Sequence, residues 1–443
     1  MRGGRRRTLS LAAGAALVAS VWFGLVGSSP PAPAAVAATT RLGAGSSPAA
    51  GVANELLPSS SPSASPSPSA SPIPSAALTA TLGSLRRQYA IPGMQATIIW
   101  PDGRSWSAVS GFANLGARVK VVRATPFAVG SITKTFVAAL ILRLAEEGRL
   151  SLDDQVVAWL PTLPATKVDP AVTIRELLSH TSGVYDYFSN HLIDPALLAS
   201  KRRIWTPAVD MRYVKTPYFA PGSGWHYSNT NYVLLGQVAE KAGGASVAAQ
   251  LRTRFLGPLR LLSASYQVAE MPRIPVAHAY TFASGSATAR PIDQADGTAV
   301  APFTSVTSAS GSAGSLAVSA WDLARWAQAL YGGRVLRPDS LAAMRDVASS
   351  TLVGGKPYGL GLQQATIDGW TVIGHGGRLL GSQSVVRYFP DLGVSIAVTT
   401  NQWRTSPDLV VEALAAIALP PAPAPTPTPS PSPSPSLTPT PAP

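Results

Sequence analysis

The sequence predicts an α/β protein in which one antiparallel sheet, built from both ends of a globular body, is flanked by helices and joined to a mainly helical domain. Three observations support this prediction. Strand-like runs lie near both ends of the body, at 94–112 and 358–400, and the stretch between them, about 136–345, has the apolar spacing of helices. The chain has 443 residues, of which 46% are hydrophobic, so it can bury a substantial core.

The first part of the chain, residues 1–37, has the layout of an export signal. Residues 1–7 carry four arginines, residues 8–27 are mostly apolar, and small residues follow. We therefore expect an extracytoplasmic protein, secreted or associated with the cell envelope. The pair Arg6-Arg7 is a weak indication of twin-arginine export. The apolar stretch approaches the ~20 residues that span a bilayer, so an uncleaved membrane anchor is the alternative.

Two segments rich in Pro, Ser, Ala and Thr flank the body, at residues 38–77 and 419–443. Such segments cannot bury a core, so both are expected to be disordered, the first as a linker and the second as a tail. They are either arms that hold the body away from a surface, for example through peptidoglycan, or tails without any partner. The globular body is then residues 78–418.

Local patterns place the elements of the body in order. Leu78–Tyr89 is predicted as a helix, followed by the strands Met94–Trp100 and Ser105–Phe112 around a turn at Pro101–Gly103. Loops rich in Pro and Gly separate the helices of the middle, and a second group of strands precedes a short terminal helix. These later elements are the helices Thr173–Leu178, Tyr232–Lys241 and Ala320–Tyr331, the strands Tyr358–Gln364, Trp370–Ile373, Ser382–Phe389 and Val394–Thr400, and the helix Glu412–Leu419.

Charge and cysteine content exclude several classes of function. The formal net charge is +13, but Lys and Arg are scattered, without a basic run interleaved with aromatic residues, which argues against nucleic-acid binding. The charge indicates no more than a mild attraction to anionic surfaces such as a cell envelope. The chain has no cysteine, which excludes disulfides, a cysteine nucleophile, thiolate metal sites and a lipid-bearing N-terminal cysteine.

A serine and a lysine at the start of one predicted helix form the first candidate site. Ser131 and Lys134 stand three residues apart and lead into the apolar run 135–144, and the helix is expected to end at Gly148. Residues at i and i+3 are neighbours on a helix, so the Lys134 amine can approach the Ser131 hydroxyl. Unpaired N–H groups in the first turn also favour negative charge on an oxygen. The pattern indicates a nucleophile beside a base, although a serine N-cap explains it too.

Two further segments carry polar side chains suited to a site. In Trp225–Thr230, Tyr227 and Asn229 stand two residues apart and point the same way if the loop is extended. In Ile373–Arg378, His375 lies between glycines that let a ligand approach the backbone. The alternatives are a helix cap in the first segment and a tight turn with an exposed histidine in the second.

In their order and spacing, the three segments resemble those of the serine hydrolases that recognise penicillin: class C β-lactamases, DD-carboxypeptidases and related esterases. The resemblance covers about residues 80–418 and implies a β-lactamase-like fold, with the site in the cleft between the sheet domain and the helical domain. Further stretches similar to that family are Leu150–Asp154, Thr173–Gly183, Phe219–Gly222, Gly311–Leu316, Trp321–Leu323 and Tyr358–Gly361. In the second of these stretches, His180 is expected to order a loop rather than to catalyse.

The resemblance implies catalytic roles for four side chains. Ser131 would attack a carbonyl and form an acyl-enzyme. Lys134 could take the serine proton only if burial or a neighbouring charge lowers its pKa from about 10.4. Tyr227, as a phenolate stabilised by Lys134 and His375, is the alternative base. The backbone N–H groups of Ser131 and Arg378 would form the oxyanion hole.

The resemblance also implies a substrate-binding role for Asn229, Gly376, Gly377 and Arg378. Asn229 would hold the substrate amide. Relatives that cleave β-lactams or D-alanyl-D-alanine ends usually have Thr or Ser where this chain has Gly376, and that hydroxyl holds the substrate carboxylate. Arg378 could replace the contact with a bidentate bond to the carboxylate. Otherwise an uncharged ester or amide is the more plausible substrate.

The sequence thus predicts an exported serine hydrolase, with a D-alanyl-D-alanine carboxypeptidase-like enzyme for cell-wall peptides as the favoured interpretation. An esterase or a class C-type β-lactamase with the same residues is the alternative, and a non-hydrolytic envelope-binding protein is a third. The expected partners are small peptides, esters or β-lactams, and peptidoglycan. We expect a monomer without metal or cofactor, no nucleic acid, and a membrane contact only if the signal is uncleaved.

Overall fold

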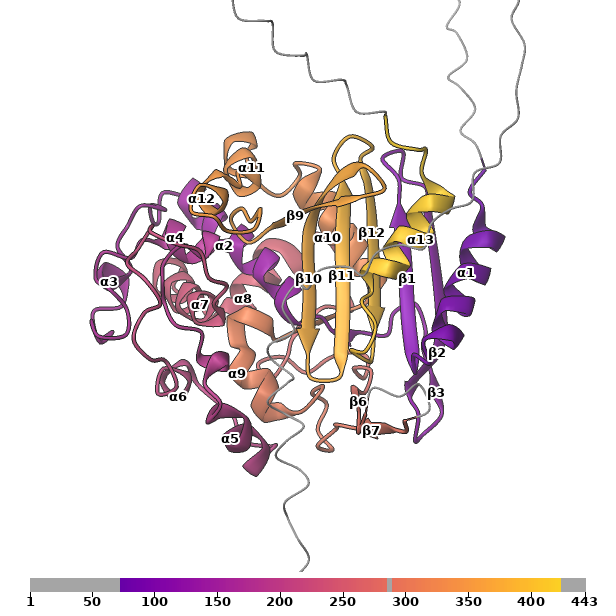
Figure 1. The fold of residues 1–443 in the computed structure, drawn as a ribbon, viewed down its shortest axis with the longest axis horizontal. Coiled ribbons are helices and arrows are strands. Elements are labelled where there is room, and N and C mark those ends of the chain that lie inside the picture. The colour runs from indigo at the N-terminus through magenta and orange to yellow at the C-terminus, as the bar shows by residue number, and fades with distance from the viewer. Residues whose placement is uncertain (1–71, 285–288, 424–443) are drawn as a thin grey trace, which may run out of the picture.

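The computed structural model describes residues 72–284 and 289–423, and its centre is a seven-stranded sheet in the order β3-β2-β1-β12-β11-β10-β9. The first strand pairs antiparallel with the last, so that Met94 lies opposite Thr400 and Ile99 opposite Ser395 (Figure 1). This pairing confirms the predicted sheet built from both ends of the body. The strands are β1 (Gly93–Ile99), β2 (Ser105–Asn114), β3 (Val119–Lys120), β9 (Gln363–Ile367), β10 (Trp370–Leu379), β11 (Ser382–Phe389) and β12 (Val394–Thr400).

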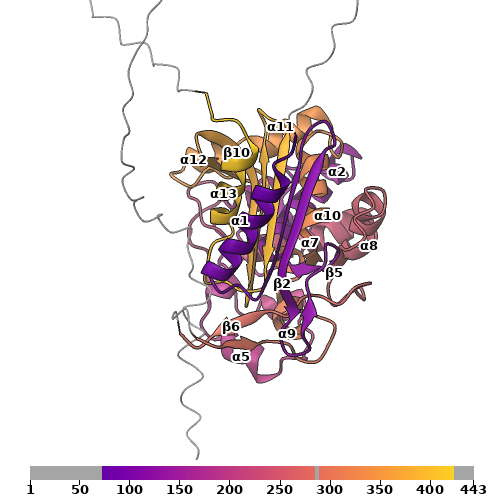
Figure 2. The same cartoon turned by 90° about the vertical axis from the view of Figure 1, so that its right-hand side faces the viewer.

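Helices cover both faces of this sheet. On one face, α1 (Ser75–Gln88) and α13 (Asp408–Ala418) lie side by side, and Leu78 and Leu414 belong to the same apolar cluster (Figure 2). On the other face, α10 (Ala320–Tyr331) packs against β1, β11 and β12. Every residue of β1 and β12 is buried as a result, and apolar residues outnumber polar ones in both strands.

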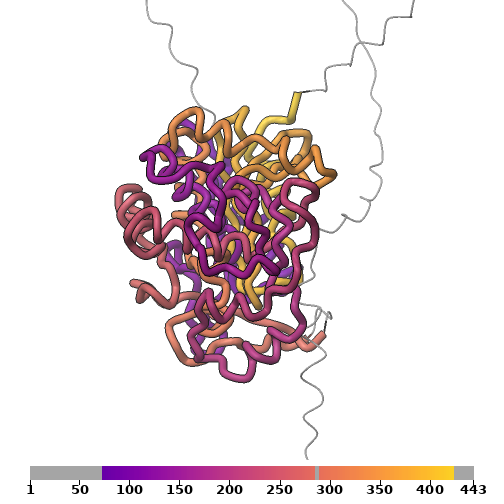
Figure 3. Tube along the Cα trace, turned by 90° about the vertical axis from the view of Figure 1, so that its left-hand side faces the viewer, coloured from indigo at the N-terminus to yellow at the C-terminus, as the bar shows by residue number. Residues whose placement is uncertain are grey.

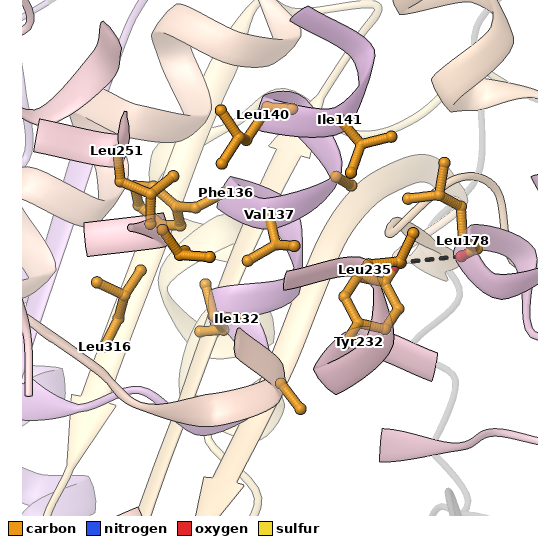
Figure 4. Packing of buried hydrophobic residues seen from close by; sticks show 14 of the residues in the cluster. Ile132, Phe136, Val137, Leu140, Ile141, Leu178, Tyr232, Leu235, Leu251 and Leu316 are labelled. Carbon is orange, nitrogen blue, oxygen red and sulfur yellow. Dashed lines mark hydrogen bonds between the residues drawn. The ribbon is translucent and has the colours of Figure 1, made fainter. Parts of the chain in front are cut away.

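The helical region is organised around α2 (Thr133–Glu146), whose apolar side chains fill a shared core (Figure 4). Phe136 of α2 stacks on Trp326 of α10 with ring centroids 4.0 Å apart, which joins this region to the sheet. Figure 3, viewed from the opposite side to Figure 2, shows the helical segments in front of the strands. The other helices of the region are α3 (Val156–Trp159), α4 (Ile174–Ser179), α5 (Ile193–Ala199), α6 (Pro207–Asp210), α7 (Asn229–Gly243), α8 (Val247–Leu251), α9 (Thr304–Gly314), α11 (Pro338–Arg345) and α12 (Ala348–Thr351).

Short strands and turns supplement these helices. A hydrogen bond of 3.0 Å from the Tyr232 hydroxyl to the Leu178 carbonyl ties α7 to α4 (Figure 4). The region is therefore mainly helical, as predicted, with small sheets at its margin. Those strands are β4 (Phe127–Ala128), β5 (Ser265–Tyr266) and β8 (Leu316–Val318) in one sheet, and β6 (Tyr280–Phe282) and β7 (Pro291–Asp293) in the other.

The predicted strand Tyr358–Gln364 is wrong in its position. The Gly359 N–H donates to the Leu362 carbonyl at 2.9 Å, so the chain reverses here instead of extending. The strand β9 begins only at Gln363, after this reversal. Hydrogen bonding between near neighbours thus overrides the apolar pattern of the segment.

The strand predicted at Trp370–Ile373 is longer than expected. It continues through the His-Gly-Gly segment to Leu379, with Gly376 opposite Val385 and Gly377 opposite Ser384 of β11. The alternative of a tight turn is therefore wrong.

Three predicted helices also begin earlier than expected, α1 at Ser75, α7 at Asn229 and α13 at Asp408.

The predicted export signal, 1–37, lies outside the described residues, as do most of the linker 38–77 and most of the tail 419–443. The last linker residues are an exception, because α1 already begins at Ser75. No helix in the described part of the chain is both long enough and apolar enough to cross a membrane.

Candidate active site

Ser131 lies in a single 3₁₀ turn, Gly130–Ile132, directly before α2 begins at Thr133. The sequence predicts Ser131 in the first turn of the α-helix, whereas the structure places it in the 3₁₀ turn just before that helix. Gly130 has a positive φ of 51°, and a side chain there would meet the Arg378 carbonyl oxygen at 2.6 Å. The turn that carries the serine is therefore pressed against the backbone of β10.

Lys134 is fully buried, and its side-chain nitrogen has three oxygen neighbours. Nζ lies 3.1 Å from the Ser131 hydroxyl, 2.8 Å from Asn229 Oδ1 and 2.8 Å from the Ala313 carbonyl at the end of α9. The predicted contact between Ser131 and Lys134 is thus present. The other two neighbours come from α7 and α9, so three separate segments enclose the amine.

Burial makes Lys134 a plausible base. It lowers the pKa of the amine to about 7, and the charge of Asp186 opposes this effect. A neutral amine has two hydrogens and one lone pair. Asn229 Oδ1 and the Ala313 carbonyl can only accept, so they take the two hydrogens and leave the lone pair facing the Ser131 hydroxyl.

Tyr227 lies on the loop before α7, with the Lys134 nitrogen 4.9 Å from the centre of its ring. Burial raises the pKa of the Tyr227 hydroxyl above its usual range, and the neighbouring Ser131 side chain offsets only part of that rise. The phenol is therefore protonated at neutral pH, which disfavours the phenolate as the base. Within residues 72–284 and 289–423, its buried oxygen finds no hydrogen-bond partner of good geometry, so it can still bond to a substrate.

Asn229 is the first residue of α7, and both ends of its amide are bonded. Its Oδ1 accepts from Lys134, and its Nδ2 donates to Asp186 Oδ2 at 3.0 Å. Ser228, between Asn229 and Tyr227, has an extended backbone with φ −137° and ψ 121°. The two side chains therefore project to the same side, as the sequence predicts.

His375 is buried in β10 and is uncharged. Burial, followed by the charge of Lys134, lowers the pKa of the imidazole to about 3. Its Nδ1 lies 2.5 Å from the Gly376 carbonyl, which can only accept, so Nδ1 carries the hydrogen. Nε2 then accepts from the Tyr358 hydroxyl at 2.9 Å. A neutral imidazole cannot supply a positive charge to Tyr227, which again disfavours the phenolate.

The end of β10 presents two glycines and an arginine beside the serine. The Gly376 N–H donates to Gln363 Oε1 at 3.0 Å, and the backbone of Gly377 lies against the Val129 carbonyl. The Arg378 guanidinium lies 4.9 Å from the ring of Trp403. Burial lowers its pKa from the usual value, and its Nε is buried without a partner in the described part of the chain. Its Nη2 donates to the Trp403 carbonyl at 3.4 Å, so the remaining N–H groups of the guanidinium are the donors that an anion could use.

Two buried groups beside the site were not predicted to have a role in it. Burial raises the pKa of Asp186 to about 6. The side chain of Asn229 bonds both Asp186 and Lys134 and so links the two. Tyr358, which lies in a segment predicted as a strand, donates a hydrogen bond to His375. The segment similar to the family, 173–183, stops just before Asp186, and no local pattern marks a buried carboxylate.

His180 supports the loop that carries Tyr227. Its Nδ1 accepts from the Ser228 N–H at 3.1 Å, and its ring lies 4.3 Å from that of Tyr227. These contacts agree with the predicted loop-ordering role of His180. Among the residues that the structure describes, no three His, Asp or Glu side chains gather in a way that could hold a metal ion.

Comparison with known proteins gives a consistent set of relatives. A family model described as Beta-lactamase matches residues 77–419. Penicillin-binding protein 4* of Bacillus subtilis is 38% identical over 154 residues, which cover 33% of this chain and 32% of that protein. Esterase EstB of Burkholderia gladioli is 30% identical over 358 residues, 74% of this chain and 90% of that protein. The crystal structure of a D-stereospecific amidohydrolase from Streptomyces sp. matches with a TM-score of 0.65 and 31% identity, covering 76% of this chain and 98% of that chain.

Proposed function

Because the chain belongs to the beta-lactamase family of serine hydrolases, we propose that it is an exported enzyme that forms an acyl-enzyme on Ser131 and acts on the D-alanyl-D-alanine ends of cell-wall peptides. One observation carries the mechanism. The buried amine of Lys134 has two acceptors for its hydrogens and therefore directs its lone pair at the Ser131 hydroxyl. Nucleophile and base are thus already in contact without substrate.

In the first step, Ser131 Oγ attacks the substrate carbonyl while Lys134 takes the hydroxyl proton. The negative charge that develops on the carbonyl oxygen would be held by the backbone N–H groups of Ser131 and Arg378. Each such donor is worth about 3 kcal/mol in comparable enzymes. The close contact between the Gly130 turn and β10 supports this assignment, because it brings the two backbone segments together.

In the second step, the tetrahedral intermediate collapses and the bond to the leaving group breaks. The protonated Tyr227 can give its proton to the leaving amine and regain one from the Lys134 ammonium, since both side chains lie beside the Ser131 hydroxyl. Water then attacks the acyl-enzyme: Lys134 accepts the water proton and passes it to Ser131 Oγ as the acyl bond breaks, which releases the acid product and restores the free serine. The uncharged His375 would take no part in proton transfer and would hold the end of β10 in place.

The carboxylate of a D-alanyl end needs a cationic partner, and Arg378 is suited to this role. Its guanidinium has five N–H donors and makes one long hydrogen bond, from Nη2 to the Trp403 carbonyl at 3.4 Å, so a carboxylate could be held by the others. The similarity to a solved structure named D-stereospecific amidohydrolase also supports a substrate that contains a D-residue. The predicted signal at 1–37 would place the enzyme in the envelope, where peptidoglycan is available, and we propose that it acts there as a monomer.

An esterase is the second candidate, and Gly376 favours it. The family members that bind a substrate carboxylate usually carry a hydroxyl at this position, and glycine provides none. Esterase EstB, 30% identical over most of both chains, supports the same alternative. A class C-type β-lactamase would use the same catalytic residues.

The test is mass spectrometry of the purified chain after exposure to a penicillin, combined with turnover of a D-alanyl-D-alanine peptide and a p-nitrophenyl ester. We expect an adduct on Ser131 and release of D-alanine. Ser131→Ala should abolish both, whereas Ser223→Ala, which removes an exposed hydroxyl bonded to the Ala220 carbonyl, should abolish neither. Ester turnover without an adduct or D-alanine release would assign an esterase instead. No reaction with any substrate would refute the proposal.

Arg378→Leu separates the two substrate classes, because it keeps the backbone N–H of the oxyanion hole. A hydrogen bond to a charged group contributes about 1.5–3 kcal/mol. We therefore expect kcat/KM for the peptide to fall by about 10- to 100-fold, with a small effect on the neutral ester. Equal losses on both substrates would contradict a carboxylate site at Arg378.

A further inference from the structure

Asp186 is a buried carboxylate that the catalytic steps above do not use. It precedes the 3₁₀ turn Tyr187–Ser189 and is only 7% exposed. Its Oδ1 accepts from the Phe188 N–H at 3.2 Å, and its Oδ2 accepts from Asn229 Nδ2 at 3.0 Å. Both oxygens therefore have donors, and one donor belongs to the side chain that bonds Lys134.

The bond from Asp186 decides which way the amide of Asn229 faces. An amide has one accepting end and one donating end, and the two can exchange by rotation of the side chain. A carboxylate only accepts, so it holds Nδ2 and turns Oδ1 toward Lys134, 2.8 Å away. In the reversed orientation, Nδ2 would face the amine and compete with the Ser131 hydroxyl for its lone pair.

We propose that Asp186 is a positioning residue of this site: its carboxylate fixes the amide of Asn229 with the acceptor toward Lys134, and Asn229 links its negative charge to the Lys134 amine. This inference rests on the proposed function of Ser131 and Lys134. It assigns a role to a residue that touches neither the nucleophile nor the substrate.

The charge of Asp186 opposes the effect of burial on Lys134. Burial lowers the pKa of the amine to about 7, whereas the carboxylate favours its protonated form. Asp186 has its own pKa raised to about 6 by burial, so it is ionised at pH 7 and above. The tyrosines and histidines with shifted pKa values around the pair are neutral there, because burial raises the pKa of the tyrosines and lowers that of the histidines. They include Tyr187, Tyr218, Tyr227, Tyr232, Tyr358, His180, His226 and His375.

Removing the charge should therefore lower the pKa of Lys134 further. In Asp186→Asn, the new amide oxygen can still accept from Asn229, so the change removes mainly charge. We expect the acid limb of the kcat/KM profile for a p-nitrophenyl ester to move about one pH unit lower. The plateau should fall several-fold, because Asn229 is held less firmly.

Asp210→Asn is the control for replacing a buried carboxylate by an amide. Asp210 is also buried, and burial raises its pKa well above the usual range, but its charge is not among the causes that shift Lys134. Its substitution should leave the acid limb in place. Asp186→Ser is a second test variant, since a serine can still cap the turn at Phe188 while removing the charge.

If the role of Asp186 were purely structural, its substitution would lower the stability of the protein and the plateau of kcat/KM without moving the acid limb of the pH profile. An unchanged limb in both Asp186 variants would overturn the inference, as would an equal shift in Asp210→Asn. If neither Asp186 variant folds, a titration of the wild-type protein tests the inference instead. The ¹⁵N signal of the Lys134 amine, assigned by its loss in Lys134→Met, should respond near pH 6 to ionisation of Asp186 as well as to its own titration. A single-step titration would overturn the inference.

The same titration separates this inference from the proposed function, because it needs no turnover. A coupled titration in a chain that hydrolyses none of the substrates would sustain the link between Asp186 and Lys134 and refute the hydrolase. Normal hydrolysis that depends on Ser131, with a single-step titration, would refute the link and sustain the hydrolase.

Discussion

Substitution of Gly377 by alanine should separate β10 from the segment that carries the nucleophile. A methyl group there would lie 1.8 Å from the Val129 carbonyl oxygen and 3.1 Å from the Ile132 nitrogen, both of them backbone atoms. To restore an ordinary contact of 3.4 Å, the two segments would have to separate by ~1.6 Å. A displacement of about 1 Å at a reacting centre can cost roughly 100-fold in rate, and one oxyanion donor about 3 kcal/mol. We therefore expect kcat/KM to fall by at least about 100-fold.

The same clash should destabilise the fold by about 1–3 kcal/mol, the usual cost of overpacking. Gly376→Ala is the matched control for stability, because the nearest atom to its methyl group is Gln363 Oε1 at 3.8 Å. Urea unfolding followed by tryptophan fluorescence measures the difference, and hydrolysis of the substrate that the wild type turns over measures the rate. If Gly377→Ala unfolds at the same urea concentration as Gly376→Ala and keeps the wild-type rate, the close approach of β10 does not hold the oxyanion hole.

Two further results follow from the protonation states and hydrogen bonds of the site. Wild-type kcat/KM should rise with pH through about 7 and then level off, because burial lowers the pKa of Lys134 to about 7 and the neutral amine is the reactive form; a rate that falls over this range would contradict Lys134 as the base. Tyr358→Phe should lower the free energy of unfolding by about 1–3 kcal/mol, since His375 Nε2 would be buried without its donor. Tyr331→Phe is the control, because the buried Tyr331 hydroxyl has no hydrogen-bond partner in the described chain and its removal should cost little. Equal losses in the two variants would mean that the hydrogen bond of Tyr358 contributes nothing.

Local patterns in the sequence were sufficient where the structure depends on near neighbours. Ser131 and Lys134 meet because residues three apart on a helical segment share a face, and that spacing is visible in the sequence. The strands β1 and β12 are recognisable because helices cover both of their faces and their residues are buried throughout. The position of strand patterns at both ends of the body was also sufficient to predict one sheet built from both ends, although not which strands pair in it.

The sequence could not show features that depend on distant partners. Whether the glycines beside His375 form a turn or a strand is decided by pairing with β11, and glycine itself has no preference. The segment beginning at Tyr358 has the apolar content of a strand, but a hydrogen bond between Gly359 and Leu362 reverses it. The role of Asp186 depends on a contact with Asn229, which stands 43 residues later in the chain.

The proposed base and the proposed oxyanion hole come from different parts of the fold, the helical region and the end of β10. The helical region encloses Lys134: α7 supplies Asn229, α9 supplies the Ala313 carbonyl, and a 2.7 Å bond from Ser312 Oγ to the Tyr232 carbonyl ties these two helices together. The lowered pKa of Lys134 is therefore a consequence of helix packing. The sheet contributes the end of β10 that lies against the serine turn. On the proposed mechanism, catalysis by Ser131 would require the helical region and the sheet to be packed together, because neither part alone holds both the Lys134 amine and the proposed donors for the oxyanion.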